Sequence, residues 1–170
     1  ATFAADRNVR IAFENCPQGP FHQHEGGWNF FCTPEMWERG FSELGAENAG
    51  LQWDPSHLVC MQIDVMESLR KFGSKVFNVH AKDARVNREI VAAHGLRHPE
   101  AATHCFPGLG DSDWGAIVAE LKRQGYDGAL DIEGQHDPIY CGDREDEGLL
   151  IAIRHLLPLV SQKGQRGGPL

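Results

Sequence analysis

Five side chains of the kinds that bind metal ions follow four short hydrophobic runs. Each run has the length and composition of a buried strand. The runs and the residues that close them are residues 9–13 with Glu14, residues 51–53 with Asp54 and His57, residues 76–79 with His80, and residues 129–132 with Glu133. In a parallel α/β sheet, ligands bind at the carboxyl ends of the strands. Acidic and imidazole side chains at several strand ends would therefore lie together at that edge. The pattern therefore predicts one divalent metal site.

Helical patterns follow these runs and supply the elements that must position the site. Thr33 and Pro34 are typical of an N-cap and a first helical residue, and Gly45 is expected to end that helix. Apolar residues at helical spacing predict three further helices, over residues 63–72 with Gly73 as the stop, residues 114–125, and residues 143–160. Strands that alternate with helices specify a parallel sheet with covering helices, so the predicted fold class is α/β.

The number of strand and helix units is small for the fold that they indicate. About four units are present, which is half of an eight-stranded (β/α)8 TIM barrel of roughly 250 residues. Residues 1–160 are therefore predicted to form half of a TIM barrel, and residues 161–170 a flexible tail. A half barrel leaves edge strands unpaired, so we expect a homodimer, pairing with a separate amino-terminal half, or a fragment of a longer chain.

Several other residues are placed to support the site. Lys82 and Asp83 closely follow His80, so either is expected to orient that imidazole, or the two pair with each other. Asp131 should face the same side of its strand as the nearby strand-end glutamate, one layer deeper. Two long loops, residues 17–32 and residues 83–110, are expected to lie over the site, because loops at the carboxyl ends of strands carry substrate contacts in such folds.

The composition excludes several classes of protein. The net charge is −8 over 170 residues, which argues against a surface for nucleic acid. No apolar run approaches 18 residues and no leader pattern precedes a cleavage site, so neither a membrane span nor secretion is indicated and a cytoplasmic location is predicted. The five cysteines form no CxxC pair, which favours reduced thiols over a disulfide framework or a zinc ribbon.

Five motifs in a fixed order resemble a known family. They are Ile-Ala-Phe-Glu-Asn at residues 11–15, Trp-Asp-Pro-Ser-His-Leu at residues 53–58, Val-His-Ala-Lys-Asp at residues 79–83, Pro-Gly-Leu-Gly-Asp-Ser-Asp-Trp at residues 107–114, and Gly-Tyr-Asp-Gly-Ala-Leu-Asp-Ile-Glu at residues 125–133. Together they resemble the sugar phosphate isomerase/epimerase family of the xylose-isomerase-like TIM barrel superfamily, which includes ketose 3-epimerases, hydroxypyruvate isomerases and inosose dehydratases. The resemblance covers about residues 9–160 and corresponds to the carboxyl-terminal half of the family's barrel.

The resemblance implies a role for each strand-end residue. Glu14, Asp54, His80 and Glu133 would bind one divalent ion, and His57 would contact substrate. Three carboxylates and one imidazole suit Mn²⁺ first, then Mg²⁺ or Co²⁺, with Zn²⁺ less favoured without thiolates. In the 3-epimerases that the chain resembles, the glutamates matching Glu14 and Glu133 remove and return a proton on opposite faces of the substrate.

The nearest cation that could meet a substrate oxygen or phosphate is Arg85. The alternative interpretation is that Arg85 is an ordinary solvent-exposed arginine of a loop.

The predicted function is isomerisation or epimerisation of a small sugar, sugar phosphate or polyol, through an enediolate stabilised by the metal. The alternatives are an inosose-type dehydratase on the same scaffold and an inactive fragment. An abasic-site endonuclease also belongs to the superfamily, but it needs an Asp-X-His pair after the histidine that matches His80. The following segment offers His94, His98 and His104 without such a pair, and the acidic charge also disfavours DNA.

Overall fold

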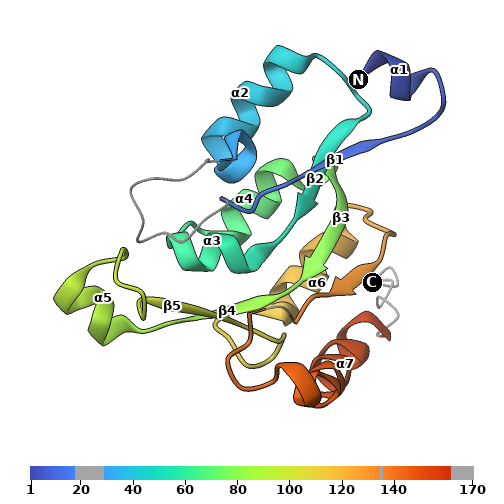
Figure 1. Ribbon diagram of the computed structural model, residues 1–170. Helices are drawn as coiled ribbons and strands as arrows, with labels where there is room; N and C mark the ends of the chain where they lie inside the picture. Colours follow the sequence, from blue (N-terminus) through green and yellow to red (C-terminus); the bar gives the residue numbers. More distant parts are fainter. Residues whose placement is uncertain (18–28, 135, 162–170) are drawn as a thin grey trace, which may run out of the picture.

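Four parallel strands form the sheet that positions the site (Figure 1). The computed structural model describes residues 1–17, 29–134 and 136–161. The strands are β1 (Ile11–Glu14), β2 (Ala49–Trp53), β3 (Val76–Ala81), β4 (Asp83–Val86), β5 (Ala102–Cys105) and β6 (Leu130–Ile132). The helices are α1 (Thr2–Ala5), α2 (Pro34–Leu44), α3 (Pro55–Met61), α4 (Val65–Phe72), α5 (Arg88–His94), α6 (Trp114–Arg123) and α7 (Glu145–Ser161), with single 3₁₀ turns at Phe30–Cys32, Gly73–Lys75 and Gly142–Arg144.

The order of the main sheet is β1-β2-β3-β6, and each neighbouring pair is parallel. This confirms the predicted α/β class and the four strands that the hydrophobic runs indicated. Strands β4 and β5 pair antiparallel in a separate hairpin, which extends with α5 away from the main sheet (Figure 1).

An irregular register between β2 and β3 sets the direction of the side chains in β3. Leu51 pairs with Val76, but the next residue, Gln52, pairs with Asn78, so Phe77 is an extra residue in β3. Such a bulge changes which residues of a strand face each side of the sheet. Beyond it the alternation is regular, and His80 faces the same side as Asn78.

The core lies on the opposite face of the sheet. Alternate residues of β2 and β3, namely Leu51, Trp53, Val79 and Ala81, have no exposed surface. They join one hydrophobic cluster with side chains from α2, α4, α6 and α7, which include Trp37, Leu69, Ile117 and Leu156. The helices therefore cover one face, and the other face is left for polar side chains.

Helix α2 begins at the predicted cap, and α6 begins in a similar way. Thr33 accepts from Met36 N at the start of α2, and Gly45 ends that helix with φ +54°. Asp113 caps α6 in the same way, by accepting from Ala116 N. The predicted glycine stop after α4 is different, because Gly73 has φ −57° and leads into a 3₁₀ turn instead of a left-handed cap.

Residues 83–110, predicted as a loop, contain the β4–β5 hairpin and α5. Residues 18–28, most of the other predicted loop, lie outside the described residues, as do residues 162–170 of the predicted tail. Among the described helices, none is both long enough and apolar enough to cross a membrane.

Candidate metal centre

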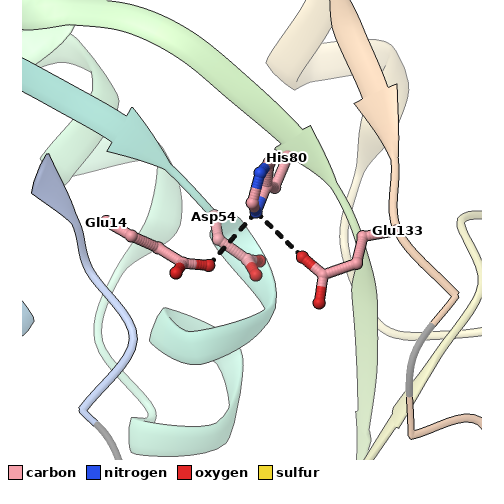
Figure 2. A group of neighbouring side chains, drawn as sticks. All are labelled: Glu14, Asp54, His80 and Glu133. Atoms are coloured by element: carbon pink, nitrogen blue, oxygen red, sulfur yellow. Dashed lines mark hydrogen bonds and ion pairs between the residues drawn. The ribbon is translucent and has the colours of Figure 1, made fainter. Parts of the chain in front are cut away.

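Four side chains converge at the carboxyl edge of the main sheet (Figure 2). Glu14 is the last residue of β1, Asp54 follows β2, His80 belongs to β3 and Glu133 follows β6. Because the strands are parallel, their ends meet at the same edge, and one donor atom from each residue lies within 4.8 Å of the others. Figure 2 shows Glu14 and Glu133 on opposite sides of His80. The structure thus brings together the four residues that the family resemblance implied.

His80 sits between the two glutamates and contacts both through one nitrogen. Its Nδ1 atom lies 3.1 Å from Glu14 Oε1 and 2.8 Å from Glu133 Oε2. Hydrogen bonds with Glu133 and Glu14 raise the pKa of His80 to about 10, and the bond from His80 is the main reason that the pKa of Glu133 falls to about 2. The imidazole therefore carries a positive charge between two carboxylates, at the place where a cation would be attracted.

Asp54 is fully buried and has two different oxygens. Oδ1 accepts from Ser56 N at 2.8 Å and begins α3, with Pro55 at the first helical position. The Asp54 backbone is fixed by Asn15, whose side chain exchanges two hydrogen bonds with it, at 2.7 and 2.9 Å. Oδ2 has no hydrogen-bond partner. Burial raises the pKa of Asp54 to about 7.

The ring of His57 lies beside Asp54 Oδ2, with its Nε2 atom 3.2 Å away. The two atoms are close enough for an ion pair but do not form a hydrogen bond. Burial lowers the pKa of His57 to about 3, so the ring is neutral at neutral pH and cannot balance a carboxylate charge. A buried carboxylate oxygen without a donor, beside three other ligand groups, is the feature expected of a cation site.

Lys82 and Asp83 have separate partners and do not pair with each other. Lys82 is 2% exposed, and its Nζ lies 2.6 Å from Glu133 Oε1. Asp83 accepts hydrogen bonds from the side chain of Trp114 and from the backbone of Ala84, Gly108 and Ser112. Lys82 thus belongs to the metal centre, whereas Asp83 fixes the glycine-rich turn before α6.

Two residues predicted near the site have no recorded hydrogen bond or ion pair with the four ligands among the described residues. Arg85 donates to the carbonyl oxygen of Leu109 and lines a cavity of about 760 Å³ on the β4–β5 hairpin. Asp131 is exposed and accepts from Asn78 at 2.9 Å, one layer below the ligands. The structure records no contact between Asp131 and Glu133 among the described residues.

A further histidine, in the segment predicted only as a loop over the site, lies beside it. His104 of β5 packs edge-on against His57, with ring centroids 5.1 Å apart, and its Nε2 is 3.9 Å from Cys60 Sγ. Burial lowers the pKa of His104 to about 4. No local spacing relates His104 to the strand ends, because the hairpin carries it there from a distant part of the sequence.

Comparison with known proteins gives a consistent picture. The family model described as xylose isomerase-like TIM barrel matches residues 1–159. An inosose dehydratase of Clostridium perfringens (strain 13 / Type A) is 33% identical over 132 residues, which are 74% of this chain and 43% of the relative. The chain spans less than half the length of the curated relatives it matches.

Solved structures share the fold. A xylose isomerase domain protein from Alicyclobacillus acidocaldarius matches with a TM-score of 0.68 and 23% identity, over 94% of this chain and 53% of that one. The IOLI protein, whose structure was solved with a binding zinc atom, matches with a TM-score of 0.66 and 24% identity, over 94% of this chain and 52% of that one. At these identities the likeness shows the fold alone.

Proposed function

The chain belongs to the xylose isomerase-like TIM barrel family, and from this premise we propose that it is a divalent-metal-dependent enzyme acting on a small sugar or polyol. The proposed leading reaction is loss of water from a polyhydroxy ketone, because inosose dehydratases are among the relatives it resembles. The observation that carries the proposal is the convergence of four strand-end ligands, one of which, Asp54, has a buried carboxylate oxygen without a hydrogen-bond partner.

The donor set determines which ions fit. Glu14, Asp54, His80 and Glu133 supply three carboxylates and one imidazole, which suit Mn²⁺, Mg²⁺ or Co²⁺ and also accept Zn²⁺. Mn²⁺ is the ion we propose. When bound, such an ion polarises a carbonyl group and stabilises the negative charge that develops on its oxygen.

Glu14 is the proposed base. Its side chain is 34% exposed and reaches the centre from one side of His80 (Figure 2). Glu14 takes the proton from the carbon next to the carbonyl and then returns it to the hydroxyl group leaving the neighbouring carbon. The substrate loses one hydrogen and one hydroxyl group as water, and Glu14 is regenerated. His57, neutral beside Asp54, is the proposed contact for a substrate hydroxyl.

Epimerisation is the second candidate, because Glu133 approaches from the opposite side of His80. That reaction needs Glu133 to return a proton to the far face of the substrate. Lys82 and His80 each engage one oxygen of Glu133, whereas Glu14 is contacted by His80 through Oε1. This difference favours a reaction in which only Glu14 moves the proton.

The proposed enzyme also needs a second half barrel, supplied by another copy of this chain or by an amino-terminal half. Strands β1 and β6 are the edges of the main sheet. Helix α7 exposes apolar side chains at helical spacing, which are Leu150, Ile153, Leu157 and Val160. Unpaired edges and an apolar helix face are what a continuing barrel would cover.

The test is calorimetric titration of Mn²⁺ into chelator-stripped protein, with light scattering to measure molar mass. We expect one ion per site, and the Asp54→Asn variant should bind it more weakly. Nuclear magnetic resonance should then detect water loss from a polyhydroxy ketone in the assembled barrel. Folded protein that binds none of Mn²⁺, Mg²⁺, Co²⁺ or Zn²⁺ would contradict the proposal.

A further inference from the structure

The two oxygens of Glu133 have different partners. Oε2 lies 2.8 Å from His80 Nδ1 and faces the other ligands, whereas Oε1 lies 2.6 Å from Lys82 Nζ. In Figure 2 one oxygen of Glu133 faces His80 and the other is turned away from it. Lys82 follows β3, two residues after His80, and therefore extends to the same side of the sheet. A lysine thus holds the oxygen that does not face the centre.

The burial of Lys82 calls for an explanation other than stability. Lysine is almost never fully buried unless it is paired, and Lys82 is 2% exposed. A buried ion pair is seldom more stable than apolar side chains of the same size, because both charges lose their hydration. The pair is therefore better explained by what it does to Glu133.

The need to neutralise a buried acid does not explain why Lys82 pairs with Glu133. Asp54 is fully buried and has an oxygen without a hydrogen bond, so it is the acid that most needs a cation. Lys82 instead pairs with Glu133, whose side chain is 26% exposed and already bonded to His80. This arrangement leaves Asp54 open to an ion and fixes the orientation of Glu133.

We propose that Lys82 is a positioning residue of the metal centre: it holds Oε1 of Glu133 away from the ion, so that Glu133 binds through Oε2 alone. The inference rests on the proposed function, because it requires a divalent ion among the four ligands. With one donor atom from each ligand, an ion of six-fold coordination keeps two positions for the two oxygens of a hydroxy-carbonyl substrate. If Glu133 bound the ion through both of its oxygens, it would occupy one of these two positions.

The arrangement should also select among ions. Ca²⁺ favours six to eight oxygen ligands and readily accepts both oxygens of one carboxylate, whereas Mg²⁺ requires near-octahedral geometry. Holding Glu133 to one oxygen therefore disfavours Ca²⁺ relative to a smaller ion such as Mn²⁺. Removal of Lys82 should release Oε1 and relax this selection.

The experiment compares Mn²⁺ and Ca²⁺ affinities of the chelator-stripped full chain by calorimetry. Lys82→Met, which keeps most of the length of the side chain and removes its charge, should raise Ca²⁺ affinity relative to Mn²⁺ by tenfold or more. Both absolute affinities should also rise, because a nearby positive charge is lost, so the ratio is the informative quantity. Lys82→Arg should restore the wild-type ratio. Lys71→Met removes the same charge from an exposed pair with Glu38 and should leave the ratio unchanged.

A second measurement follows the water bound to Mn²⁺. Released Oε1 should displace one coordinated water in Lys82→Met and lower the proton relaxivity of the bound ion, which a merely structural lysine would not do. Lys82→Gln supplies a second neutral variant if the methionine variant does not fold. An unchanged ion ratio and relaxivity in a folded neutral variant that binds Mn²⁺ overturns the role of Lys82 alone. Wild-type protein that binds neither ion overturns the proposed function as well.

Discussion

Replacement of Asp54 by asparagine should stabilise the metal-free protein and destabilise the metal-loaded one. Asparagine keeps an oxygen that can accept from Ser56 N, so the start of α3 is preserved. It removes the charge from a side chain that has no exposed surface and an Oδ2 atom without a hydrogen bond. The substitution therefore isolates the cost of burying this carboxylate without an ion.

The magnitude follows from the pKa of Asp54, which burial raises from 3.8 to about 7. At 1.36 kcal/mol for each pKa unit, the shift corresponds to about 4 kcal/mol. The folded protein binds the proton of Asp54 more tightly than the unfolded chain does. This proton binding therefore stabilises the folded state fully below pH 4, and the stabilisation is lost as the pH rises to about 7. The variant should therefore match wild type near pH 4 and exceed it by about 4 kcal/mol near pH 8.

Urea unfolding in the presence of a chelator, from pH 4 to pH 8, measures this difference. Mn²⁺ should reverse the order once its concentration exceeds about 1,000 times the wild-type dissociation constant, because an ion at that ratio stabilises the protein by about 4.1 kcal/mol and the variant loses a ligand. The contrary result is a metal-free variant less stable than wild type at every pH. It would mean that His57 is charged and pairs with Asp54, and the ion site would lose its main structural argument.

Three further predictions concern other residues. The wild-type protein should lose stability as the pH falls from 6.5 to about 4, because the unfolded chain binds a proton at His104 while the folded protein keeps this ring neutral. His104→Asn should reduce that loss by up to about 3 kcal/mol, measured by acid unfolding. Glu14→Gln should slow deuterium exchange at the substrate carbon next to the carbonyl by about 100-fold or more, measured by nuclear magnetic resonance. Trp114→Phe removes one of the donors to Asp83 and should cost about 1–3 kcal/mol in urea unfolding.

The parallel sheet and the ligand cluster were predictable because each depends on short-range patterns. A hydrophobic run closed by an acid or an imidazole marks a strand end, and parallel strand ends meet at one edge. The motifs around Asp54 and His80 then predicted the family, which the family model confirms over residues 1–159. The cap at Thr33 was likewise predictable from the adjacent residues.

The partners of the supporting residues were not predictable in this way. Lys82 and Asp83 are adjacent in sequence, yet one pairs with Glu133, 51 residues away, and the other with Trp114, 31 residues away. Nothing local separates these outcomes, because both depend on how β6 and α6 return to the sheet. The hairpin that brings His104 to the site was missed for the same reason, since short strands in a polar segment have weak periodicity.

The charges of the centre also favour a divalent ion. The three carboxylates lie beside Lys82 and a His80 ring whose pKa is raised by its hydrogen bonds to Glu133 and Glu14, so that the ring keeps its proton. An ion that takes the place of this proton would leave His80 neutral, and its two positive charges together with Lys82 would balance the three carboxylates. A monovalent ion would leave one buried negative charge unbalanced, which is costly in a site as enclosed as that of Asp54.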